Sequence, residues 1–216
     1  YLLVIMTLIQ ITVVSFILIL LPLFRLGWKG KNKWNIVLYF GGIGTGYMFV
    51  EMVFIQRFIL YLGNPVYAAS AVITLLLIFS GLGSYKSDYF ARNSNRMPLM
   101  VSGIVALLLL YSFVLTPVLQ NTVHLTLPLK ILIISLLTVP LAFCMGLPFP
   151  VGLSELSKTN QRDIPWAWGI NSCFSVVSTA LATIIAVEMG FTWVMWIAAV
   201  AYCLPLIVQM RWRSAS

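Results

Sequence analysis

Between Gly44 and Pro65 the chain reads GTGYMFVEMVFIQRFILYLGNP, a run long enough to cross a bilayer that also contains a carboxylate, an amide and a guanidinium. About 20 apolar residues in helical conformation span the hydrocarbon core of a membrane. The whole chain of 216 residues is apolar, with 61% hydrophobic and 8% charged residues. An average soluble domain has roughly 25% charged residues. The sequence therefore predicts an integral membrane protein.

Seven apolar segments are separated by short polar stretches, and we expect each to form a transmembrane helix. Transmembrane strands would alternate apolar and polar residues over about ten residues, and these segments show no such alternation. The predicted spans cover residues 2–24, 35–62, 66–84, 98–119, 128–150, 165–188 and 191–210. Because no long linker separates them, the predicted fold class is all-α: a polytopic transmembrane helix bundle forming one domain, residues 1–216.

Basic residues predict how the bundle lies in the membrane, because lysine and arginine accumulate in cytoplasmic loops. Apart from Arg57 and Lys130, which lie in helix ends, they all follow odd-numbered spans. They are Arg25, Lys29, Lys31, Lys33, Lys86, Arg92, Arg96, Lys158, Arg162, Arg211 and Arg213. This alternation predicts an external N-terminus and a cytoplasmic C-terminus in a cell membrane, such as the bacterial inner membrane. Since residue 1 is not methionine and no charged segment precedes the first apolar run, we expect Tyr1 to be an internal or processed start.

Charged groups within the second span need partners, because a charge at mid-bilayer costs about 2.5–3.5 kcal/mol on insertion scales. Glu51 and Arg57 point about 120° apart on a straight helix, so they are not expected to pair with each other. Gln56 and Arg57 are better placed to meet the fifth or sixth span, and Lys130 and Glu188 are predicted at the same level. Two interpretations stay open: a polar clamp between helices, or a binding site for a proton or a substrate.

The glycine-rich stretch FGGIGTG, Phe40 to Gly46, is not a dinucleotide-binding loop, because that motif requires a preceding strand and a βαβ unit. Gly42 and Gly46 have instead the spacing that lets two membrane helices approach closely. We predict a helix-packing surface here, with a glycine hinge as the alternative.

Two prolines, Pro148 and Pro150, predict a break at the end of the fifth span, since each lacks a backbone donor. The carbonyl groups freed at the break need protein or water as partners. Asn171, one to two turns inside the sixth span, is a candidate for that role. The break is interpreted either as a structural kink or as the broken helix of a transporter-type substrate site.

Several classes of function are disfavoured. Three cysteines within spans and a single histidine, His124, make a disulfide framework, a metal site or a catalytic serine–histidine–acid set improbable. We therefore expect no catalytic residues, metal or cofactor in this chain. The net charge of +8 is explained by topology and by attraction to anionic lipid headgroups, so nucleic acid is not an expected partner.

Three blocks of sequence carry a family resemblance. They are GTGYMFVEMVFIQRFILYLGNPVYAASAVITLLLIFSGLGS, AFCMGLPFPVGLSEL and PWAWGINSCFSVVSTALATIIAVEMGF. In this order they resemble the C-terminal membrane region of bacterial spermidine-synthase-like, or polyamine-aminopropyltransferase-like, multi-pass membrane proteins. The resemblance implies a soluble module with a Rossmann fold of the S-adenosylmethionine type upstream of the helices. The 216 residues contain no such module, so enzymatic activity is not expected of this chain alone.

Three functions remain open. The first is a non-catalytic membrane subunit or anchor, whose partners are the lipid bilayer and a soluble module or larger membrane complex. The second is a transporter-like domain for a small, cationic solute, with Glu51 and Glu188 facing the ligand. The third is the membrane half of a polyamine- or methyl-transferring enzyme.

Overall fold

The computed structural model describes residues 2–24, 33–91 and 96–214, and within these ranges the chain is helical and contains no strand. The helices are α1 (Leu2–Ser15), the π-helical turn η1 (Phe16–Leu20), α2 (Leu21–Phe24), α3 (Lys33–Leu62), α4 (Pro65–Ala91), α5 (Arg96–Asn121), α6 (Leu127–Met145), α7 (Pro148–Thr159), the 3-10 turn η2 (Gln161–Asp163), α8 (Ile164–Glu188) and α9 (Phe191–Ser214). Four residues used for the predicted orientation, Arg25, Lys29, Lys31 and Arg92, lie outside the described ranges.

Six helical segments of the described chain are long and apolar enough to cross a membrane, which confirms the all-α class and makes this a membrane protein. They correspond to predicted spans two to seven. The first predicted span is also helical, from Leu2 to Phe24, but its apolar part Ile5–Ile19 is shorter than the other six. The seventh crossing and the orientation of the two termini therefore stay predictions.

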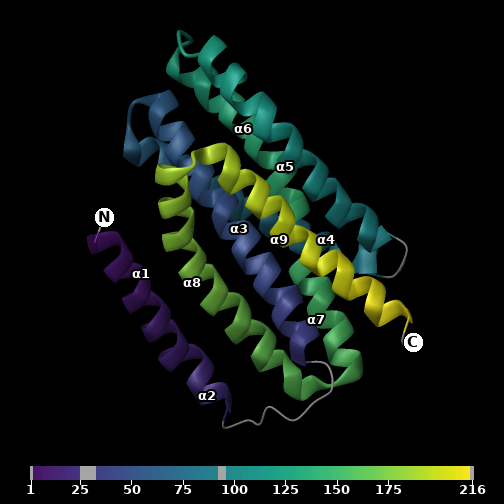
Figure 1. The fold of residues 1–216 in the computed structure, drawn as a ribbon. Helices are drawn as coiled ribbons and strands as arrows, with labels where there is room; N and C mark the ends of the chain where they lie inside the picture. Colours follow the sequence, from purple (N-terminus) through teal and green to yellow (C-terminus); the bar gives the residue numbers. More distant parts are fainter. Residues whose placement is uncertain (1, 25–32, 92–95, 215–216) are drawn as a thin grey trace.

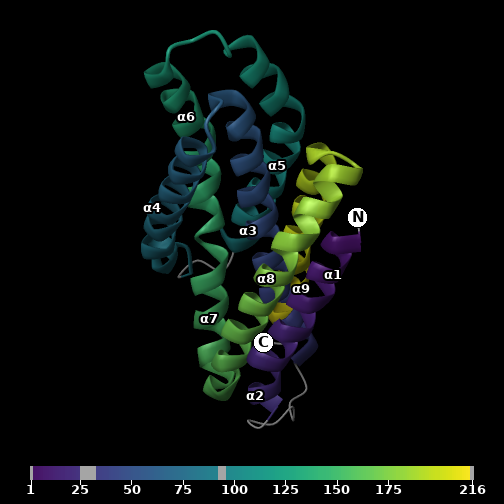
Figure 2. The same ribbon diagram turned by 90° about the vertical axis from the view of Figure 1, so that its left-hand side faces the viewer.

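The helices run side by side along one common direction, with α3 in the middle of the bundle (Figure 1). Helix α3 packs against α8, α9 and α4, while α5 packs against α9 and α4 packs against α6. Figure 2 shows α4 and α6 on one side of α3, and α8, α9 and α1 on the other. Helix α1 lies at the edge of the bundle against α8.

The connections gather at two ends of the bundle. Lys33, which begins α3, forms an ion pair with Asp163, just before α8. Near the other end of α3, the hydroxyl groups of Tyr61 and Thr122 lie 2.9 Å apart, and Thr122 directly follows α5. We call these the Lys33 end and the Tyr61 end.

Two tight turns at the Tyr61 end require glycine. Gly63 ends α3 with a φ of 70°, and Gly190 separates α8 from α9 with a φ of 91°; both values lie in the left-handed region, where a Cβ atom is unfavourable. After Gly63, the side-chain oxygen of Asn64 accepts hydrogen bonds from the backbone N–H groups of Val66 (2.9 Å) and Tyr67 (3.2 Å). Asn64 thereby caps α4, and Pro65 begins it without losing a helical hydrogen bond.

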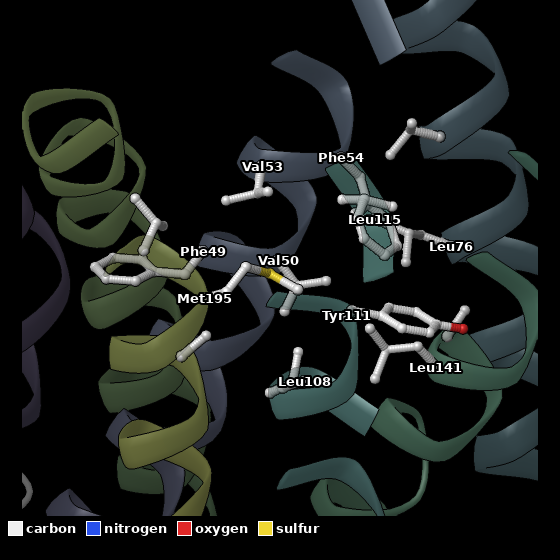
Figure 3. Packing of buried hydrophobic residues seen from close by; sticks show 14 of the residues in the cluster. Phe49, Val50, Val53, Phe54, Leu76, Leu108, Tyr111, Leu115, Leu141 and Met195 are labelled. Carbon is white, nitrogen blue, oxygen red and sulfur yellow. The ribbon is translucent and has the colours of Figure 1, made fainter. Parts of the chain in front are cut away.

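Buried side chains form two clusters along the bundle. The larger contains Phe54, Leu108, Tyr111 and Met195, which meet between α3, α5 and α9 (Figure 3). The smaller lies at the Lys33 end and includes Phe40 and Trp166. Because lipid is as apolar as these side chains, close packing rather than the hydrophobic effect holds such helices together.

Between the two clusters α3 is rich in glycine, and its neighbours approach its backbone closely. A Cβ atom at Gly42 would lie 2.6 Å from the Ala201 carbonyl oxygen, and one at Gly46 would lie 2.6 Å from the Tyr202 ring, both on α9. A Cβ atom at Gly44 would lie 2.6 Å from the backbone oxygen of Asn171 on α8. The face of α3 that contains Gly42 and Gly46 thus packs against α9 of the same chain. Gly44 allows a second close approach, to α8, which the predicted packing surface of Gly42 and Gly46 did not include.

Candidate functional site

The fifth predicted span divides just before its prolines. Helix α6 ends at Met145, and α7 begins at Pro148 and continues to Thr159, well beyond the predicted end at residue 150. The N–H of Gly146 binds the Ala142 carbonyl at 3.1 Å, and the N–H of Leu147 binds the Cys144 carbonyl at 3.2 Å. Pro148 and Pro150 both lie in the first turn of α7, where the missing donors cost nothing. The break therefore lies before the prolines rather than at the end of the helix.

A tyrosine binds the backbone at the break. The hydroxyl of Tyr39, which is buried in α3, donates to the Pro148 carbonyl at 2.9 Å. The sequence predicts Asn171 as the hydrogen-bond partner of a carbonyl group freed at the break. In the described chain Tyr39 has this role. Sequence reasoning missed Tyr39 because an aromatic residue in an apolar span is usually part of the core.

Helix α4 lies directly against the break. A Cβ atom at Gly146 would lie 2.0 Å from the Ser80 carbonyl oxygen, and one at Gly83 would lie 2.1 Å from the Phe143 carbonyl oxygen. Real Cβ atoms do not approach an oxygen that closely, so glycine is required on both sides of the contact. These two glycines bring the backbone of α4 into contact with the backbone around residues 143–146.

A pocket of about 450 Å³ lies beside this contact, between α3, α4, α8 and the break. Its polar lining consists of Tyr47, Ser80, Ser84, Asn171 and Ser175. The hydroxyl groups of Tyr47 and Ser80 lie 3.5 Å apart. The side-chain oxygen of Asn171 is buried and has no hydrogen-bond partner among the described residues.

The pocket lies about halfway along the bundle and is open on one side, where the exposed residues Leu77 and Gly81 line it. Gly44, which lines it, is about 17 Å along α3 from Lys33, given a rise of about 1.5 Å per residue. A bilayer core is about 30 Å thick, so a helix that starts at its boundary reaches the midplane near Gly44.

Glu51 lies about one turn beyond Tyr47 on the same face of α3 and is half-buried. In the described part of the chain it has no ion pair and no hydrogen bond. Glu188 is exposed at the end of α8. No ion pair of the described chain joins Glu51 or Glu188 to Arg57 or Lys130.

Arg57 faces α5 and α9, not the fifth or sixth span as predicted. Its guanidinium carbon lies 4.7 Å from the centre of the Phe191 ring, and Thr116 of α5 lines the crevice beside it. Gln56, the preceding residue, is half-buried. The six-residue offset from Glu51 turns Arg57 to the other side of α3, as helical geometry requires.

Lys130 stabilises the end of α3. Its ammonium group donates to the Tyr61 carbonyl at 3.2 Å and lies 5.1 Å from the centre of the Tyr61 ring. A cation at a helix C-terminus is favourable because the last carbonyl groups carry partial negative charge. Lys130 therefore has a local structural role.

Comparison with known proteins adds no relative to this geometry. No protein-family model, curated protein or solved structure matches the chain.

One charged site was not anticipated. Lys33 and Asp163 form a buried ion pair, and the Lys33 ammonium group also lies 5.0 Å from the centre of the Trp166 ring. The pair joins the first residue of α3 to the residue just before α8, at the Lys33 end. From the sequence, Lys33 serves only as an indicator of orientation. The sequence signal that could have indicated the contact is that Lys33 and Asp163 lie at the same predicted membrane boundary.

Proposed function

We propose that this chain is a transporter-like membrane domain that binds a small, polar, cationic molecule in the pocket at the α6–α7 break. The observation that carries the proposal is Asn171, a pocket-lining residue whose buried side-chain oxygen lies beside Gly44 and has no hydrogen-bond partner in the described chain. A buried acceptor without a partner costs about 1–3 kcal/mol. A ligand that donates a hydrogen bond to Asn171 removes that cost.

The lining of the pocket favours a donor-rich ligand. Serine and tyrosine hydroxyl groups can accept as well as donate hydrogen bonds, and the Asn171 oxygen can only accept. No lysine or arginine is among the lining residues. An ammonium group offers three donors and no acceptor, so an amine complements this surface better than an anion does.

Glu51 adds the matching charge. It lies on the same stripe of α3 as Gly44 and Tyr47, and no basic side chain of the described chain pairs with it. A carboxylate near a pocket in low dielectric attracts a cation over several ångströms. We therefore assign Glu51 the role of attracting the cation and Asn171 the role of binding it.

The test compares 1,4-diaminobutane with its neutral analogue 1,4-butanediol on the chain purified in lipid nanodiscs. We expect the diamine to bind and the diol not to bind. Asn171→Leu should weaken diamine binding about five- to tenfold, since a hydrogen bond contributes about 1 kcal/mol net. Ser172→Leu, at the neighbouring exposed position, should leave binding unchanged. Equal binding of both probes, or full binding by the Asn171→Leu variant, would refute the proposal.

A second candidate function is that of a membrane subunit or anchor for a soluble module, as the resemblance to spermidine-synthase-like membrane proteins implies. It is favoured by α7, which continues past the pocket and exposes Glu155 and Lys158, joined by an ion pair of 2.7 Å. In the bacterial inner membrane this surface would face the cytoplasm. Purification from native membranes tests it: a soluble protein retained in stoichiometric amount, and lost after Lys158→Glu, supports docking there, and purification without a partner argues against it.

A further inference from the structure

A second site lies at the Tyr61 end, separate from the break pocket. It is a cavity of about 260 Å³ between the last turns of α3 and α5. Arg57, Tyr61, Thr116 and Gln120 supply its polar groups. The rest of the lining is apolar: Leu60, Leu119 and Val123.

Arg57 has no counter-ion in this cavity. Neither ion pair of the described chain includes it, and its buried Nε has no hydrogen-bond acceptor there. Arginine keeps its charge under all ordinary conditions. A partly buried guanidinium that lacks a carboxylate is poorly compensated by the Phe191 ring alone, because a cation–π contact contributes only about 0.5–2 kcal/mol.

The surroundings of Arg57 add further positive charge. Lys130 lies on the ring of Tyr61, which lines the same cavity. The site therefore combines a guanidinium that has no counter-ion with a nearby ammonium group.

We propose that this cavity binds a phosphate-bearing molecule, with the Arg57 guanidinium as the main ligand of the phosphate. Guanidinium and phosphate match in a two-point hydrogen-bonding geometry. Thr116 and Gln120 offer additional donors, while the apolar side of the cavity suits an acyl chain. Arg57 is five residues from the end of α3, about 8 Å along the helix axis. With α3 ending at the membrane surface, this places the guanidinium in the headgroup region. The phosphate is supplied either by a phospholipid or by a free anion.

The experiment measures the thermal stability of the chain in detergent with three additives: phosphatidylglycerol, a diacylglycerol with the same acyl chains, and inorganic phosphate. We expect phosphatidylglycerol to raise the melting temperature and the diacylglycerol to leave it unchanged. A rise with inorganic phosphate as well assigns the site to the free anion, and no rise with it assigns the site to the lipid. Equal effects of phosphatidylglycerol and diacylglycerol overturn the proposal.

The variants locate the effect at Arg57. Arg57→Gln should abolish the shift, and Arg57→Lys should retain part of it because the charge remains. Arg162→Gln, an exposed position at the Lys33 end, should retain all of it. If Arg57→Gln does not fold, Thr116→Val should reduce the shift without removing the guanidinium. A full shift in Arg57→Gln overturns the assignment. If Arg57→Gln does not fold, a full shift in Thr116→Val overturns it.

Discussion

Gly83→Ala is expected to destabilise the bundle strongly, although alanine is a better helix former than glycine. The new Cβ atom would lie 2.1 Å from the Phe143 carbonyl oxygen, so α4 has to move away from the break. Overpacking of this kind costs about 1–3 kcal/mol or more. The measurement is the free energy of unfolding in mixed micelles. Gly146→Ala, on the other side of the contact, should behave in the same way.

Gly81→Ala is the matched control, two residues earlier in α4. A Cβ atom there meets no atom within 4 Å, so the substitution should leave stability unchanged or raise it by up to about 1 kcal/mol. Equal stability of the Gly81→Ala and Gly83→Ala proteins would show that α4 does not contact the break as described.

The second large effect is expected at the Lys33–Asp163 ion pair. Removing one partner of a buried pair leaves the other charge uncompensated and costs about 3–5 kcal/mol. We expect losses of this size for Lys33→Met and for Asp163→Leu. The double variant should lose much less than the sum, since it leaves no unpaired charge. Unfolding free energies of the four proteins give the coupling directly.

The exposed pair Lys158 and Glu155 provides the control. It lies in one helix with an N–O distance of 2.7 Å, and exposed pairs contribute about 0–1 kcal/mol. Its removal should therefore be nearly neutral. Additive effects of the two substitutions at Lys33 and Asp163 would contradict the buried contact.

Much of the fold could be predicted from the sequence because membrane helices have a strong signal. Long apolar segments indicated where most helices lie, and the structure confirms the all-α class. Pro148 was assigned to a break at the end of the fifth span, whereas it begins a further helix, α7. Boundaries in polar segments were less accurate. Helix α4 continues to Ala91, beyond the predicted end at residue 84, since a helix can extend past the apolar core into water.

Tertiary partners were harder to predict than elements. The periodicity of α3 correctly separated Glu51 from Arg57, but it does not determine which helix faces each side chain, and Arg57 meets α5 and α9. The break pocket requires residues from four parts of the chain, including Ser80 and Ser175. Neither serine is distinctive in sequence, because single serines are common in membrane helices. Only the packing brings them together with Asn171.

The most direct test of the proposed site is the access of water to the break pocket. In a chain whose three native cysteines are replaced by alanine, Ser175→Cys places a thiol in the pocket lining, and Val176→Cys places one at the adjacent exposed, apolar position. We expect a cationic, membrane-impermeant thiol reagent to modify Cys at position 175 much faster than at 176, and 1,4-diaminobutane to slow the reaction at 175 alone. A thiol at 175 that reacts no faster than the one at 176 would contradict the account.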